Sequence, residues 1–240
     1  MTFFAETTEA RKKQLREFAE QGKTQLFETL WSELLDQHPE AVDAFMGGIA
    51  GLESIGNFEK AGQLLSALVA RLQDQGLFAE SLVALRKMSE IAPRERIIKH
   101  GLLTAFRSIY KDDPRLPIYL AQSKLETDVD LKTALQKIDT YFSFEAGRYV
   151  NHGAGWGPGK IVEVDAEATA IVVDFGTKKG HRLSMEMARG ITEFLQSNDL
   201  RAMKLDRIEE LKRLAEDDPV ELVRATLRSR RNKATLREIK

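Results

Sequence analysis

Residues 153–160, which read GAGWGPGK, are the stretch whose residue types and spacing come closest to a known chemistry, the binding of a phosphate. Residues 154–160 approximate the Walker A pattern, and AIVVD at 170–174 imitates the strand and aspartate of a Walker B motif. A phosphate loop leads directly into a helix, whose N-terminal amides hold the anion. Here Lys160 is followed by Ile161 instead of Ser or Thr, and then by a β-branched run. Nucleotide binding is therefore not expected.

The same glycines predict a turn between two antiparallel strands. Pro158 stands where a dinucleotide-binding GxGxxG motif needs its third glycine, so that alternative fails as well. Glycine permits a positive φ and close packing, and proline stiffens the bend. Trp156 is then expected on or under the sheet, and Trp156 and Lys160 are candidate contacts at a protein interface.

The residues able to act as nucleophiles or metal ligands are few. The histidines are His38, His100, His152 and His181, and cysteine is absent, which excludes disulfides, thiolate zinc sites and cysteine nucleophiles. His152 and His181 fall in one predicted β-unit and can face each other, but no carboxylate completes a zinc-ligand spacing. No motif for nucleophilic or acid–base catalysis occurs. We expect no enzyme activity, no cofactor and no metal.

The basic, histidine and tryptophan side chains of the β-unit are the candidate partner-binding residues. They are Arg148, His152, Trp156, Lys160, Lys178, Lys179, His181 and Arg182. The cations could form a basic edge that meets an acidic protein surface or a nucleic-acid backbone, or GTKKGH at 176–181 could be an ordinary polar turn. A strand edge such as residues 170–175 is a second candidate, because an exposed edge can pair with a partner's strand. RSRRNK at 228–233 suits either a solvated helix face or a nucleic-acid contact.

Three predicted domains position these residues in an α+β fold. Residues 1–141 form a helical-repeat domain, residues 142–196 a small β-barrel with a following helix, and residues 197–240 a helical tail or linker. The formal net charge of −1 gives no overall basic field for nucleic acid. The N-terminus lacks a signal peptide, and no apolar run approaches the roughly 20 residues of a membrane helix. We expect a cytoplasmic protein with no membrane or small-molecule partner.

The first segment has apolar residues at helical spacing, interrupted by turn residues. The predicted breaks are Gly22, Pro39, Gly56, Gly76, Pro93 and Pro114. The interval from Gly22 to Pro39 equals that from Gly76 to Pro93, which is typical of helical hairpins in tetratricopeptide-type repeats. The repeats are unevenly spaced, so we predict an irregular α-solenoid, which serves either protein docking or plain scaffolding.

The second segment changes to short runs rich in β-branched and aromatic residues. Strands are predicted at 148–152, 159–165, 170–175 and 181–185, separated by turn residues. Four or five strands in so short a segment suit a small Tudor-like or SH3-like antiparallel barrel. Ser184 is a natural N-cap for a helix that is expected to run through MEMARGITEFLQ.

One resemblance rests on a turn glycine, a hydrophobic-Val-x-His strand, the pattern G-x-G-x-[IV] and a strand that ends in Asp-Phe. With these features, residues 144–196 resemble the small Tudor-like RNA-polymerase-interacting modules of CarD-like regulators and transcription-repair coupling factors. With GWGPGKI, VVDF and KKGHRLSMEMA between helical regions, the chain is most similar to the N-terminal extension of long-form GreA-type transcript cleavage factors.

This resemblance implies a non-catalytic docking region of a transcription elongation factor, which binds RNA polymerase through the barrel and other protein through the helical array. Nucleic acid near the transcription complex is a second expected partner. GreA-type cleavage depends on a long coiled coil with acidic tip residues, and no helix pair of that length fits here. A shortened chain or a relative that keeps only the docking part is therefore expected. The alternative is a nucleic-acid- or peptide-binding Tudor module on a helical scaffold, whose aromatic cage would need Tyr149, Trp156 and Phe175.

Overall fold

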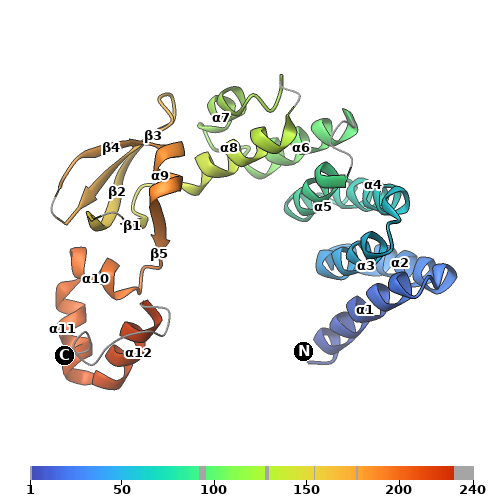
Figure 1. The fold of residues 1–240 in the computed structure, drawn as a ribbon, viewed down its shortest axis with the longest axis horizontal. Coiled ribbons are helices and arrows are strands. Elements are labelled where there is room, and N and C mark those ends of the chain that lie inside the picture. Colours follow the sequence, from blue (N-terminus) through green and yellow to red (C-terminus); the bar gives the residue numbers. More distant parts are fainter. Residues whose placement is uncertain (1, 92–95, 128–129, 154, 177, 230–240) are drawn as a thin grey trace. The chain divides into compact units, whose positions relative to one another are not determined.

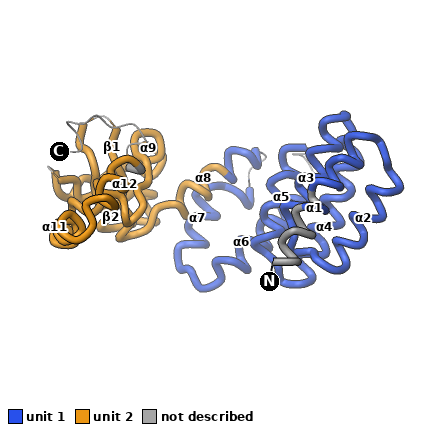
Figure 2. The backbone as a smooth tube through the Cα atoms, turned by 90° about the horizontal axis from the view of Figure 1, so that it is seen from below, with its two compact units in different colours: residues 1–135 blue, residues 136–240 orange. Residues whose placement is uncertain are grey.

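The computed structural model describes residues 2–91, 96–127, 130–153, 155–176 and 178–229 (Figure 1). Pro93, Ala154, Thr177 and most of the RSRRNK run lie outside the described residues. The chain forms two compact units, residues 1–135 and 136–240, which Figure 2 colours blue and orange. The α+β class is confirmed, since helices accompany one antiparallel sheet. The three-part division at 141 and 196 stays a prediction.

The first unit is helical throughout its regular elements. Its helices are α1 Thr2–Glu20, α2 Thr24–Gln37, α3 Val42–Ser54, α4 Phe58–Asp74, α5 Phe78–Ile91, α6 Arg96–Ile109, α7 Leu116–Ser123 and the start of α8 Leu131–Ser143. The predicted breaks at Gly22, Gly56 and Gly76 coincide with helix ends. Between α3 and α4, Gly56 has a φ of 75°, and Asn57 caps α4 by accepting the N–H of Lys60 at 3.3 Å.

Helix α1 packs against both α2 and α3, and from α3 to α6 each helix packs against the next one in the chain. In α3, a Cβ on Gly51 would lie 2.7 Å from the Cβ of Ala19, so only glycine allows α1 and α3 to approach this closely. Trp31 is buried beside Phe27 and Phe45, with ring centroids at 5.7 and 4.8 Å. The repeat geometry of an α-solenoid stays a prediction.

The second unit is built on a five-stranded antiparallel sheet in the order β4-β3-β2-β1-β5 (Figure 1). The strands are β1 Tyr149–His152, β2 Gly157–Asp165, β3 Ala170–Phe175, β4 His181–Ser184 and β5 Thr192–Leu195. Among the described residues β4 and β5 do not pair with each other, so the sheet is open, and closure into a barrel is not confirmed.

The strand pairing of the sheet corrects two predictions. The helix expected to run through MEMARGITEFLQ ends early: α9 is Met185–Ile191, and the next four residues pair with β1. Thr192 and Phe194 favour extended backbone, and the β1 edge supplies the partner that helix periodicity cannot reveal. The 170–175 segment, predicted as a possible free edge, is β3 and lies between β2 and β4. The edges of the sheet are β4 and β5.

Register assigns the side chains of the sheet to two faces. Val150 and Phe175 both lie opposite Gly159, so these three residues share one face. Tyr149 lies opposite Lys160 and Leu195, which places these on the other face. Val150 and Phe175 are fully buried.

The C-terminal segment is helical, as predicted, with α10 Leu200–Asp206, α11 Ile208–Asp217 and α12 Pro219–Ser229. Helix α10 covers the face of the sheet that carries Tyr149 and Leu195, and its Ala202 packs against both residues. Leu200, Met203 and Leu211 form a further buried cluster that fixes α11 and α12 to α10. Within the part of the chain that the structure describes, no helix combines the length and the apolar character needed to cross a membrane.

Candidate docking surface on the five-stranded sheet

Four aromatic rings meet at one end of the sheet, and we call them the aromatic cluster. They are His152 at the end of β1, Trp156 just before β2, Phe175 at the end of β3 and His181 at the start of β4. Trp156 stacks on His152 with centroids 4.5 Å apart and meets His181 edge-to-face at 4.1 Å. Phe175 lies 5.5 Å from Trp156 and 5.8 Å from His152. Contacts between aromatic rings stabilise the loops that carry them by more than the burial of their apolar area alone.

Gly159 makes room for the aromatic cluster. A Cβ at this position would lie 2.6 Å from Cδ1 of Phe175 and 2.8 Å from Cγ1 of Val173. Both neighbours are fully buried and cannot move outward. The glycine therefore serves the packing of Phe175 beneath the Trp156 loop, which is the structural role that the turn interpretation of GAGWGPGK predicts.

Lys178 and His181 give the aromatic cluster its electrostatic character. The Nζ of Lys178 lies 4.7 Å from the centroid of the Trp156 ring, a cation–π contact. Burial lowers the pKa of His181 below its ordinary value, and the charge of Lys178 and the nearby His152 lower it further. The neutral form of His181 is therefore favoured, and Lys178 carries positive charge at this end of the sheet.

Three other predicted cations are paired with carboxylates. Arg182 pairs with Asp165. The Nζ of Lys179 lies 3.6 Å from Oδ2 of Asp174. Lys160 forms the third pair, with Asp206 of α10. These carboxylates reduce the positive potential that the sequence places on this edge.

Lys160 belongs to the face opposite the aromatic cluster. Its Nζ lies 2.5 Å from Oδ2 of Asp206, and the hydroxyl of Tyr149 donates to the same carboxylate at 2.9 Å. The hydrogen bond that Lys160 donates to Asp206 raises the pKa of Lys160. Burial raises the pKa of Asp206, but the hydrogen bonds from Lys160 and Tyr149 outweigh that effect and leave it below its ordinary value. The strand register places Tyr149 on the face opposite Phe175, so Tyr149, Trp156 and Phe175 do not form an aromatic cage.

Arg148 lies on a ring at the β5 side of the sheet. Its guanidinium sits 4.2 Å from the centroid of Phe194, and its Nη1 donates to the carbonyl of Ser143 at 2.5 Å. Phe144 packs against Phe194 with centroids 5.3 Å apart. Phe194 remains 40% exposed, so this pair presents apolar surface beside the β5 edge.

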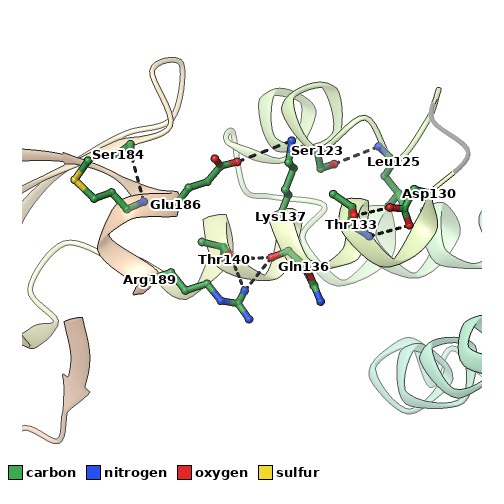
Figure 3. Close-up of polar contacts among 11 residues, drawn as sticks. Ser123, Leu125, Asp130, Thr133, Gln136, Lys137, Thr140, Ser184, Glu186 and Arg189 are labelled. Carbon is green, nitrogen blue, oxygen red and sulfur yellow. Dashed lines mark hydrogen bonds and ion pairs between the residues drawn. The ribbon is translucent and has the colours of Figure 1, made fainter. Parts of the chain in front are cut away.

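Contacts between α9 and α8 hold the connection from β4 to β5 (Figure 3). Ser184 caps α9 by accepting the N–H of Met187 at 3.2 Å, as predicted. Arg189 then donates to the carbonyl of Gln136 at 3.0 Å and to the hydroxyl of Thr140. These contacts lie within the second unit and fix the helix that separates the two edge strands.

The eight predicted residues thus divide into two groups. His152, Trp156, Lys178 and His181 meet at the aromatic cluster, whereas Arg148, Lys160, Lys179 and Arg182 make their contacts elsewhere. Asp206 was not predicted as the partner of Lys160. No sequence pattern indicates this pair, because the two residues lie far apart in the chain. In the described ranges, no three His, Cys, Asp or Glu side chains gather closely enough to hold a metal ion.

Comparison with curated proteins shows a similarity to a transcription elongation factor. Over 194 residues the chain is 23% identical to the transcription elongation factor GreA of Borreliella burgdorferi, a match that covers 80% of this chain and 21% of that protein. The chain therefore spans about a fifth of the length of this relative. No family model and no solved structure matches the chain. The similarity supports a distant relation to GreA.

Proposed function

We propose that this chain is a non-catalytic docking region of a transcription elongation factor, in which the sheet of residues 149–195 is a Tudor-like module that binds RNA polymerase. The observation that carries the proposal is the similarity to GreA over 80% of the chain. The helical unit would bind another protein. Because the match covers only 21% of the relative, no cleavage activity is proposed.

The charges of the sheet favour a protein partner over nucleic acid. Binding along a phosphate backbone needs several cations that are free to displace counterions. Lys160, Lys179 and Arg182 each have a carboxylate partner within the sheet unit. These ion pairs within the chain leave few cations for a phosphate backbone. A surface with charges of both signs suits a protein interface instead, where complementary charges set the orientation of the partner.

The edge strands offer the geometry for docking a partner's strand. The N–H of Met185 donates to the carbonyl of Thr169 at 2.8 Å, so by alternation along β4 the backbone of Arg182 points away from β3. The N–H of Gly153 donates to the carbonyl of Ile191 at 3.2 Å, and the same alternation turns the backbone of Phe194 outward from β5. Each edge can therefore extend the sheet by one strand.

A binding experiment tests the function. The full chain is immobilised and exposed to purified core RNA polymerase and, in parallel, to duplex DNA across a salt series. We expect saturable polymerase binding and little DNA binding. Absence of polymerase binding together with DNA binding that weakens steeply with salt would refute the proposal.

Proline substitutions then locate the docking edge. Arg182→Pro removes an outward N–H from β4 without removing a hydrogen bond to β3, and Arg182→Ala is its side-chain control. Phe194→Pro and Phe194→Ala are the matched pair for β5. At the edge that pairs with polymerase, the proline variant loses binding that the alanine variant keeps.

A further inference from the structure

Lys178 differs from the other lysines and arginines of its end of the sheet. Lys179 and Arg182, its neighbours along the chain, are each paired with a carboxylate. Lys178 instead lies over the ring of Trp156, is exposed, and has no carboxylate within ion-pair distance among the described residues. A cation–π contact involves the charge of the ammonium but does not occupy its three N–H donors, which can still bind an acceptor. Lys178 is thus positioned and still able to bind an anion.

The nearby carboxylates are committed to other groups. Asp174 accepts the N–H of Gly180 at 2.7 Å and pairs with Lys179. Asp165 pairs with Arg182 and accepts the N–H of Ala168 at 3.0 Å. The charges that act on His181 come from Lys178 and His152. Asp165 and Asp174 are each engaged with another cation, so the uncompensated charge beside His181 is positive.

We propose that Lys178 and His181, held around Trp156, bind an Asp or Glu side chain of the docked partner, and that His181 takes up a proton when it binds. This inference rests on the proposed docking function and names the chemistry of one contact within it. A single carboxylate matches the single unpaired ammonium. A nucleic-acid backbone would instead require the cations that Asp165, Asp174 and Asp206 already neutralise.

The proton uptake follows from the position of His181. In the free protein its pKa lies below 6.5, since burial, Lys178 and His152 disfavour the charged ring. A carboxylate beside Lys178 removes that repulsion and attracts the imidazolium, so the pKa of His181 is higher in the complex. The complex then binds more protons than its parts. Affinity is highest below the pKa of the free protein and is lost as pH rises through the pKa of the complex.

The first test uses the full chain and core RNA polymerase at constant ionic strength between about pH 6 and pH 8. We expect wild-type affinity to increase toward the lower pH and His181→Gln to flatten that dependence. Lys178→Gln should weaken binding about fivefold, the size of an exposed ion pair. The matched control is Lys212→Gln in α11, which removes an exposed lysine paired with Glu209 and should change affinity by less than about twofold. Equal effects of the two lysine variants would overturn the inference, as would pH-independent binding.

A second test separates this inference from the proposed function. The pKa of His181 is followed by NMR in the full chain with a short polyglutamate peptide, a polylysine peptide or a short DNA duplex added. We expect polyglutamate alone to raise the pKa, and Lys178→Gln to abolish the rise. If polymerase does not bind but polyglutamate gives this result, the docking function is wrong and the carboxylate site stands. No shift with polyglutamate, or a larger shift with DNA, overturns the carboxylate assignment.

Discussion

Substitution of Gly159 by alanine tests the packing on which the docking surface depends. The added Cβ would lie 2.6 Å from the Phe175 ring and 2.8 Å from Cγ1 of Val173, whereas ordinary contacts begin at 3.4 Å. The neighbours must therefore retreat by most of an ångström. Phe175 cannot do so freely, because it is fully buried and its ring also packs with those of Trp156 and His181.

The magnitude follows from two opposing effects. Overpacking a buried site typically destabilises by about 1–3 kcal/mol. Replacing glycine reduces the entropy of the unfolded chain and returns roughly 0.4–1 kcal/mol, since the φ of Gly159 is not in the left-handed region. The free energy of unfolding should therefore fall by about 1–2 kcal/mol, which lowers the Tm of a unit of this size by roughly 5–15 °C.

The assay is thermal unfolding of the full chain followed by two-dimensional NMR, so that the amides of residues 149–195 are observed separately from the helical unit. Gly153→Ala is the matched control in the same loop. Its Cβ would have only the carbonyl oxygen of Ile191 within reach, at 4.0 Å, and its Tm should hardly change. If Gly159→Ala unfolds at the wild-type temperature, Phe175 has room that the packing argument denies, and the reasoning is wrong.

Three further outcomes are expected. In the helical unit, Gly51→Ala should lower the free energy of unfolding by about 1–3 kcal/mol in denaturant titrations, whereas Gly62→Ala, whose Cβ meets open space within α4, should raise it by up to about 1 kcal/mol. Asp206→Asn should weaken the Lys160 contact by about 1 kcal/mol and speed amide exchange in α10; unchanged exchange would exclude a stabilising role. Because the pKa of His181 is lowered in the folded chain, the unfolded chain binds more protons, so the free energy of unfolding should decrease as pH falls below 6.5, and the decrease should be smaller in His181→Gln.

The turn at GAGWGPGK could be predicted because residues within and next to this stretch exclude the two nucleotide-binding motifs that it resembles. Ile161 after the lysine and the β-branched run that follows exclude a phosphate loop without any knowledge of tertiary structure. Ser184 likewise signals the start of α9 through its side chain alone, and the structure confirms the cap.

The identity of β5 could not be predicted in the same way. Residues 185–195 carry a helix-forming start and a β-forming end, and the division between them is set by pairing with β1, which lies some forty residues earlier. The same dependence on pairing placed residues 170–175 inside the sheet and made β4 and β5 its edges.

The sequence by itself determined the alternation of turn and apolar residues, and so the helical first unit, the positions of four strands and the local caps. These follow from short-range preferences of the backbone and side chains. The tertiary structure alone decided which cations are neutralised, because Asp206 reaches Lys160 only after α10 folds onto the sheet, and which lysine remains available. Lys178 and Lys179 are adjacent in sequence and similar in chemistry, yet one lies on Trp156 and the other beside Asp174.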